Sequence, residues 1–250
     1  MLILLPPSEG KTGRVRGARL DPASLSFPEL TPVRAKVATA LADVSAAGDA
    51  PSVLGVSANL VDEIARNTVL ATAPTLPALE CYSGVLYDAL AYADLSPAAR
   101  RRANRWLVVV SALYGAVRPK DRIAPYRLSM AVNLPGVGPL ASVWKPHLAP
   151  LLTQAAGRGL VVDCRSSTYA AAWTPTGQLA SRWVQVHVPG ATHMAKHTRG
   201  LVAAAICELD REPGTPAALA AALAASGRFE VSLAEPARPG RPWTLSTTPA

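Results

Sequence analysis

The side chains best suited to chemistry are concentrated between Ser111 and Arg127. This stretch contains a serine, two tyrosines, a lysine and three arginines, namely Ser111, Tyr114, Arg118, Lys120, Arg122, Tyr126 and Arg127. Hydroxyl groups hydrogen-bond bases and sugars, and arginine holds phosphate in a bidentate manner, so the stretch suits an anionic or nucleic-acid-like ligand. The alternative is a basic surface loop that is merely solvated.

Basic residues also occur in two other segments that could do chemistry. Lys11 follows an apolar run, and a lysine there is a point charge for phosphate or, once desolvated, a base or Schiff-base nucleophile. The surrounding Gly-Lys-Thr is not a nucleotide-triphosphatase loop, because that motif needs a glycine where this chain has Leu5. Lys196 and Arg199 are three residues apart at the start of a predicted helix and suit an anion. For Lys11, Lys196 and Arg199 alike, the alternative to a role in a site is an ordinary solvated side chain.

Short apolar runs precede these segments and predict the strands that position them. The sequence predicts buried strands at residues 2–5, 107–110 and 159–163. Apolar residues recur at helical spacing in two further segments, 31–46 and 57–67. In open α/β sheets the loops at the carboxyl ends of the strands form the ligand crevice. Since residues 164–169 repeat the hydroxyl and arginine content of the first loop, we expect both loops to face one crevice.

A hairpin sequence lies between residues 133 and 141. Leu-Pro-Gly-Val-Gly, with Gly136 and Gly138, is similar to the hairpin of a helix-hairpin-helix motif, in which glycines let backbone N–H groups approach a DNA phosphate. Residues 142–154 could supply the second helix, and 124–132 make a poor first one because of Pro125. The element near 124–154 is therefore either a DNA hairpin or a Gly/Pro turn.

Composition indicates one globular domain spanning residues 1–250, with an extended C-terminal tail at 236–250. Half of the residues are hydrophobic, and strands alternate with helices, which predicts a mixed α/β fold with a central mixed β-sheet flanked by helices. The formal net charge is +8, and most of the excess is arginine, which favours an anionic partner. The oligomeric state is not readable from the sequence.

Cysteine usage and the absence of an apolar span predict a cytoplasmic protein. The three cysteines are widely spaced and form no C-x-x-C pattern, which indicates a reducing compartment. No segment approaches the ~20 apolar residues needed to cross a bilayer, so we expect no membrane association. His193 and His197 are four residues apart, but Met194 stands where a zinc hydrolase has glutamate. We assign no metal site and no cofactor.

The stretch Ser111–Pro119, followed by Pro-Tyr-Arg-Leu at 125–128, closely resembles the most characteristic block of the YaaA peroxide-stress family. Weaker blocks follow the family in order along nearly the whole chain: Met1–Leu4 with Ser8 and Lys11, Gly84–Tyr87, Trp144, Ser166-Ser167 with Tyr169, and Ala195-Lys196 with Arg199-Gly200. The chain departs from the family at 88–90, at Glu9-Gly10 and at His197, which leaves substrate or DNA preference open.

The resemblance implies a cytosolic protein that limits peroxide damage by holding down free intracellular iron and binds duplex or branched DNA through a basic cleft. We take as catalytic candidates Lys11, Ser111, Tyr114 and Lys196. We take as DNA- or anion-binding candidates Ser8, Arg118, Arg122, Arg127, Gly136, Gly138, Arg165, Ser166, Ser167, Tyr169 and Arg199. No cluster of carboxylates and histidines has convincing metal spacing, so an effect on iron would be indirect.

The same residues also fit an enzyme that acts on a nucleobase, a nucleotide or damaged DNA. Tyrosines can stack on a base, basic residues can hold a phosphate, and a lysine of lowered pKa could attack a sugar carbon as in a glycosylase or lyase. Glu9 or Asp163 could supply the carboxylate of a glycosidase. A non-catalytic small-molecule sensor is a third alternative. Convergence of these residues in one pocket would favour the enzyme, and spreading over an open groove would favour DNA binding.

Overall fold

The computed structural model describes residues 1–190 and 193–250, and its centre is a seven-stranded mixed β-sheet. The strand order is β10-β11-β9-β8-β1-β3-β4, in which the five strands from β11 to β3 run parallel and the two edge strands are antiparallel. These strands are β1 (Leu2–Leu5), β3 (Leu107–Ser111), β4 (Gly115–Val117), β8 (Val161–Asp163), β9 (Trp183–His187), β10 (Phe229–Ala234) and β11 (Trp243–Pro249). The mixed α/β fold with a central mixed sheet is thus confirmed.

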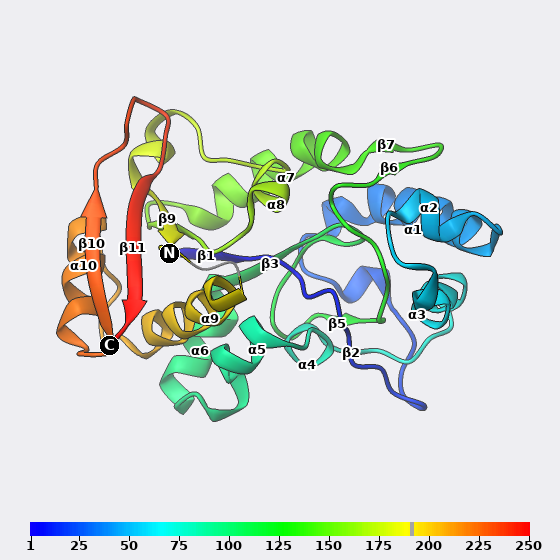
Figure 1. Ribbon diagram of the computed structural model, residues 1–250, viewed down its shortest axis with the longest axis horizontal. Helices are drawn as coiled ribbons and strands as arrows, with labels where there is room; N and C mark the ends of the chain where they lie inside the picture. Colours follow the sequence, from blue (N-terminus) through cyan, green and yellow to red (C-terminus); the bar gives the residue numbers. More distant parts are fainter. Residues whose placement is uncertain (191–192) are drawn as a thin grey trace.

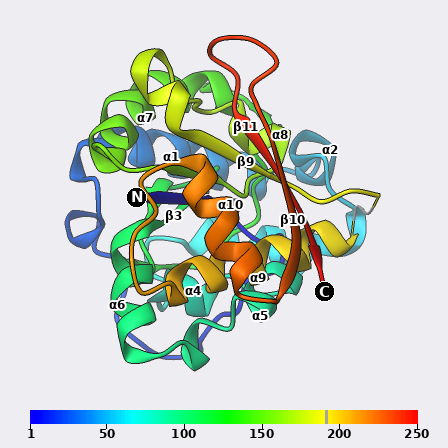
Figure 2. The same cartoon turned by 90° about the vertical axis from the view of Figure 1, so that its left-hand side faces the viewer.

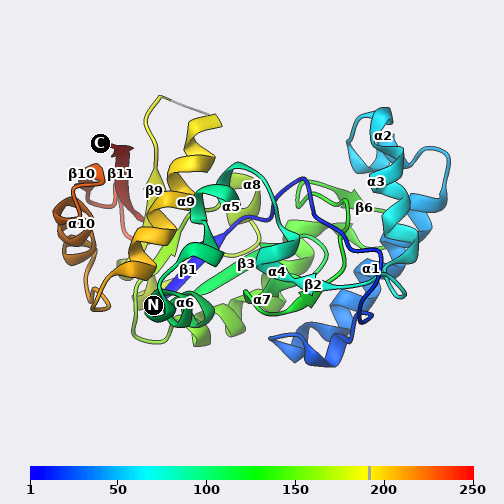
Figure 3. The ribbon, with the colours of Figure 1, turned by 90° about the horizontal axis from the view of Figure 1, so that it is seen from below.

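Helices cover the sheet on both sides. The α-helices are α1 (Thr31–Ala46), α2 (Ala50–Leu54), α3 (Val61–Ala65), α4 (Ala78–Cys81), α5 (Val85–Leu90), α6 (Pro97–Trp106), α7 (Leu140–Ala156), α8 (Ser167–Ala170), α9 (His193–Glu208) and α10 (Pro216–Ala225). Figure 3 shows α7 and α9 on opposite sides of the central strands. Figure 2 shows α10 alongside β10, which it packs against. Within the described chain, no helix is long and apolar enough to cross a membrane.

The central strands point toward the helices that come early in the chain. Every residue of β1 and β3 is buried, as expected of apolar strands covered on both faces. Both strands run toward α1–α3, which lie at the other end of the molecule from β10, β11 and α10 (Figure 1). The loops after β1, β3 and β8 therefore lie between the sheet and α1–α3, where the sequence predicts a crevice.

One glycine controls how closely the β3–β4 turn approaches α7. Gly115 has a φ of +71°, and a Cβ there would lie 2.5 Å from the ring of Trp144. The Trp144 indole in turn donates a hydrogen bond of 2.8 Å to the carbonyl of Ala112. Only glycine combines this backbone conformation with room for the ring, so the turn and the helix are fixed together.

The structure corrects the helix-hairpin-helix hypothesis. Residues 124–132 contain no helix, so the first helix of such a motif is absent. The hairpin is formed by the short strands β6 (Asn133–Leu134) and β7 (Gly138–Pro139), and it leads directly into α7. Its turn, which holds Gly136, lies across a groove from α1. Pro125, which lacks a backbone N–H donor, is one physical reason that the preceding segment is not helical.

The C-terminal segment takes part in the sheet. Residues 243–249 form β11, which pairs with β10 on one side and with β9 on the other. Leu245 and Thr247 are buried there, so the segment expected as an extended tail is an interior strand. A second small pairing joins β2 (Leu76–Pro77) to β5 (Arg122–Ile123).

Candidate functional site

A pocket of about 460 Å³ opens at the carboxyl ends of β1 and β8. Its walls come from the loop after β1, the segment before α5, the irregular stretch at 127–129, α8 and α9. The polar residues that line it are Ser8, Glu9, Lys11, Ser83, Tyr87, Arg127, Ser129, Ser166, Tyr169, Lys196 and Arg199. Segments far apart in sequence thus meet in one concave site of the size that holds a small ligand, about 300–1,000 Å³.

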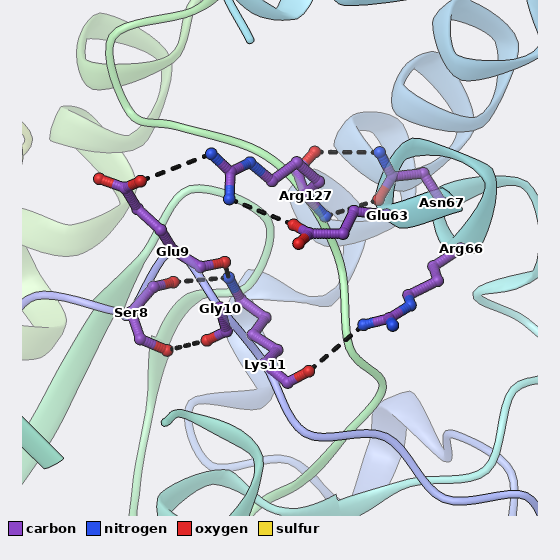
Figure 4. Close-up of polar contacts among 8 residues, drawn as sticks. All are labelled: Ser8, Glu9, Gly10, Lys11, Glu63, Arg66, Asn67 and Arg127. Atoms are coloured by element: carbon purple, nitrogen blue, oxygen red, sulfur yellow. Dashed lines mark hydrogen bonds and ion pairs between the residues drawn. The ribbon is translucent and has the colours of Figure 1, made fainter. Parts of the chain in front are cut away.

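Lys11 lies half-buried in the loop after β1, and its ammonium is held in a defined position. The Nζ atom donates hydrogen bonds to the carbonyls of Ser8 at 2.6 Å and Glu9 at 3.2 Å. It also lies 4.2 Å from the ring centroid of Tyr126 and 5.6 Å from that of Tyr82. Figure 4 shows the side chain turned back toward its own loop. We call this region the Lys11 end of the pocket.

The Lys11 environment shifts the amine toward its neutral form. Its pKa is lowered from 10.5 to about 8, mainly by burial and in smaller part by the nearby Arg127 cation, while Cys81, Glu63 and Glu9 act in the opposite direction. Desolvation dominates because aromatic rings occupy space where water would solvate an exposed ammonium. A lysine in this range is partly unprotonated near neutral pH and can act as a base or a nucleophile.

Arg127 joins the Lys11 loop to α3. Its guanidinium contacts Glu63 at 3.2 Å and Glu9 at 3.5 Å (Figure 4). Its backbone is clamped by the fully buried Asn67, whose amide accepts from the Arg127 N–H at 2.8 Å and donates to its carbonyl at 2.9 Å. The cation is therefore fixed beside the pocket and balanced by two carboxylates.

A buried hydrogen-bonded cluster lies beneath the Lys11 end. The Tyr126 hydroxyl contacts the Ser111 hydroxyl at 2.7 Å and the Tyr82 hydroxyl at 3.2 Å, while Ser111 accepts from the Tyr114 N–H at 3.0 Å. Burial raises the pKa of Tyr82, Tyr114 and Tyr126 above the ordinary value, so these phenols stay neutral. Ser111 and Tyr114 lie outside the pocket lining, and their contacts hold the tyrosine rings that surround the lysine.

Ser166 and Tyr169, at the start of and within α8, form the other end of the pocket together with two residues from α9, and we call it the α9 end. Ser166 is the N-cap residue of α8, but its hydroxyl makes no capping hydrogen bond. Tyr169 lines the pocket beside it, and burial raises the pKa of its phenol. Lys196 and Arg199 project from the first turns of α9. No described carboxylate forms an ion pair with either basic residue.

Three of the predicted arginines bind protein groups outside the pocket. Arg165 is buried and makes a bidentate ion pair with Asp163 at 2.8 and 2.7 Å. Arg118 donates to the carbonyl of Arg105 at 2.5 Å. Arg122 donates to the carbonyl of Thr75 at 2.7 Å. Ser167 is exposed on α8, and the hairpin glycines Gly136 and Gly138 lie outside the pocket lining. These residues shape the surroundings of the site.

Sequence reasoning missed several residues that complete the site, namely Glu63, Asn67, Ser83 and Ser129. The Ser83 N–H donates to the Ser8 hydroxyl at 3.1 Å, which ties the Lys11 loop to the segment before α5. Gly84, which belongs to a block that the sequence analysis names, precedes α5 as its N-cap residue with a φ of +97°. Glu63 and Asn67 lie in a segment whose pattern indicates only packing.

The described residues contain no group of three or more His, Cys, Asp and Glu side chains that could hold a metal ion. The side chain of His193, considered above for a metal pair with His197, lies outside the described residues.

Comparisons with known proteins give a consistent assignment. A family model described as peroxide stress protein YaaA matches residues 1–230. A UPF0246 protein from Streptomyces coelicolor is 48% identical over 98% of this chain and 97% of its own length. UPF0246 proteins from Corynebacterium efficiens and Corynebacterium glutamicum are 45% and 38% identical, over 86% and 85% of this chain and 88% and 87% of their own lengths.

Proposed function

Because this chain belongs to the YaaA peroxide stress protein family, we propose that it acts in the oxidative-stress response on a damaged component of nucleic acid bound in the Lys11 pocket. The observation that carries the proposal is an amine whose pKa is lowered to about 8 inside a pocket of about 460 Å³. Convergence of the basic and hydroxyl residues in one concave site favours an enzyme with a small reacting group over a diffuse binding surface.

The reaction we propose is imine formation between Lys11 and a sugar aldehyde. Hydrolytic loss of an oxidised base, in which water replaces the base at C1, leaves a deoxyribose whose C1 is an aldehyde in its open form. The neutral amine of Lys11 adds to that carbon, and the carbinolamine then loses water to give the imine. Tyr87 lines the pocket as a fixed part of its wall, because its ring stacks on Tyr82 with the ring centroids 5.4 Å apart and its hydroxyl donates to the Pro6 carbonyl at 2.7 Å.

Reductive trapping tests this function directly. The protein is incubated with an oligonucleotide containing one abasic site, or with 2-deoxyribose 5-phosphate, and sodium borohydride is added to deliver hydride to the imine carbon. We expect a stable covalent adduct on Lys11, identified by peptide mass spectrometry, and no adduct in Lys11→Met. Lys36→Met is the matched control, because Lys36 is exposed on α1. No adduct in the wild type, or an adduct that persists in Lys11→Met, would reject the proposal.

DNA binding is the second candidate, and an exposed basic loop favours it. Residues 12–19 are exposed and carry Arg14, Arg16 and Arg19, directly after Lys11. With a net charge of +8, this loop offers phosphate contacts beside the pocket. Binding to duplex, single-stranded and branched DNA should fall steeply with salt, and an Arg16→Gln, Arg19→Gln double variant should flatten that dependence. An unchanged salt dependence would exclude this loop from DNA contact.

The reduction of free intracellular iron and the cytosolic location stay predictions that rest on the family resemblance and on the sequence composition. Since the proposed imine chemistry uses an amine and an aldehyde, it requires no metal ligand set. A direct effect on iron would appear as stoichiometric iron binding by the purified protein, which dialysis followed by metal analysis measures.

A further inference from the structure

The two ends of the pocket differ in charge balance. At the Lys11 end, Arg127 is paired with Glu63 and Glu9. At the α9 end, Lys196 and Arg199 have no acidic partner among the described residues. Residues three apart lie on the same face of a helix, so the two cations act together. The α9 end therefore carries two formal positive charges, and no described carboxylate forms an ion pair with either.

Arg199 is held in place and retains a buried donor without a partner. Its Nε atom is shielded from solvent and makes no hydrogen bond to the described chain. The adjacent Gly200 brings α9 against α5 so closely that a Cβ would lie 2.1 Å from the Leu86 carbonyl oxygen. The backbone that carries the guanidinium is thus fixed, and a buried N–H donor is normally satisfied in a native protein. A ligand oxygen would satisfy it.

Ser166 adds a neutral donor at the same end. It occupies an N-cap position, where a serine hydroxyl ordinarily accepts from the helix backbone, but here the hydroxyl makes no such bond. It lines the pocket together with Lys196 and Arg199. A hydroxyl donor beside two cations is a set that binds tetrahedral oxyanions well.

From this arrangement we propose that the α9 end is a subsite for a phosphate monoester of the ligand, with Lys196, Arg199 and Ser166 as its binding residues. A phosphate monoester is close to a dianion at neutral pH and matches the two cations, whereas an internal phosphodiester carries a single charge. The subsite belongs to the proposed enzyme, whose ligand is then a sugar phosphate, a nucleotide or a phosphorylated strand end. This inference rests on the proposed function in one respect only, namely that the reacting group of the ligand is a sugar aldehyde.

Binding measurements test the subsite without requiring any reaction. Calorimetry compares 2-deoxyribose 5-phosphate with 2-deoxyribose, and a 5′-phosphorylated with a 5′-hydroxyl oligonucleotide. We expect the phosphorylated member of at least one pair to bind about tenfold or more tightly in the wild type. The pair that shows the preference identifies the source of the phosphate. Equal binding within both pairs would overturn the subsite.

Variants assign the preference to the α9 end. In a Lys196→Gln, Arg199→Gln double variant we expect the phosphate preference to disappear, and in Arg199→Lys we expect part of it to remain. Lys145→Gln removes one positive charge from an exposed position on α7, as Lys196→Gln does from α9, and should keep the full preference. A preference that survives in the double variant would overturn the assignment. Thermal unfolding of each variant shows whether it is folded, and Lys196→Gln alone replaces the double variant if that one is not.

Failure of the subsite and failure of the proposed function give different results. If borohydride traps Lys11 but neither the sugar pair nor the oligonucleotide pair shows a phosphate preference, the imine chemistry stands and the subsite is wrong. If phosphate is preferred through Lys196 and Arg199 but borohydride traps nothing, the subsite stands and the proposed reaction is wrong.

Discussion

Lys11 should react with small aldehydes faster than the exposed lysines of the chain near neutral pH. Burial lowers its pKa from 10.5 to about 8. At pH 7 about 9% of an amine with pKa 8 is neutral, against about 0.03% of one with pKa 10.5, a ratio of about 300. Because a less basic amine is also a weaker nucleophile, we expect a net advantage on the order of tenfold.

Reductive methylation with limiting formaldehyde and cyanoborohydride measures this advantage at each lysine. The modification rate of Lys11 should rise with pH through a midpoint near 8, as peptide mass spectrometry can follow. Lys36 and Lys145 are exposed and serve as internal references in the same sample. A Lys11 rate below both references across the pH range, or a Lys11 midpoint near 10.5, would refute the assignment of a poised amine.

An Arg127 variant tests the cause of the shift. The Arg127 cation lowers the Lys11 pKa, whereas Glu9 and Glu63 raise it. Arg127→Gln removes the cation and leaves the two carboxylates unbalanced, so the Lys11 midpoint should move upward. Arg118→Gln loses the same charge outside the pocket and should leave the midpoint in place. An unchanged midpoint in Arg127→Gln would contradict the electrostatic account.

Three further predictions concern stability, measured as free energies of unfolding in urea. Because the Lys11 pKa is lower in the folded protein, the unfolded chain binds more protons between pH 8 and 10.5, so the free energy of unfolding should rise over this range, and less so in Lys11→Met. Gly115→Ala should cost about 2–4 kcal/mol through ring overlap and backbone strain, against about 1 kcal/mol for Gly136→Ala, where nothing lies within 4 Å. Asp163→Asn should cost about 3–5 kcal/mol because Arg165 stays buried without its carboxylate.

The centre of the sheet and the general place of the site were predictable from the sequence. The strands β1, β3 and β8 are short apolar runs followed by polar loops, and this pattern identifies buried parallel strands and the edge at which ligands bind. The helix at 31–46 was predicted with the bounds that α1 has. Local patterns of this kind depend on near neighbours in the chain, which is why they can be read directly.

The partners of individual polar side chains were not predictable. The sequence predicts the centre of the site in the basic, hydroxyl-rich loop after β3, but Ser111 is fully buried and Arg118 binds a backbone carbonyl of α6. A sequence shows the type of a side chain but not whether a distant segment supplies its partner. The ion pair of Arg165 is different, because its partner Asp163 lies only two residues earlier in the sequence and is therefore a local signal.

The C-terminal strand was missed for a different reason. Residues 243–249 alternate Trp243, Leu245 and Thr247 with polar residues, which is the period of a strand, but the preceding prolines suggested an extended segment on the surface. Its pairing with β9 is long-range, and that pairing makes the segment an interior strand. Alternation over so few apolar residues does not by itself decide between an edge strand and an interior one.

The difference between the two ends of the pocket is itself an argument for a phosphorylated electrophile. A phosphate placed next to Lys11 would raise its pKa and return the amine to its unreactive protonated form. The charges that shift the Lys11 pKa are Arg127, Glu63 and Glu9 at its own end of the pocket, and neither Lys196 nor Arg199 is among them. An anion bound there would therefore supply binding energy while the amine at the Lys11 end stays partly neutral. A non-reacting part of the ligand then positions the carbon that reacts.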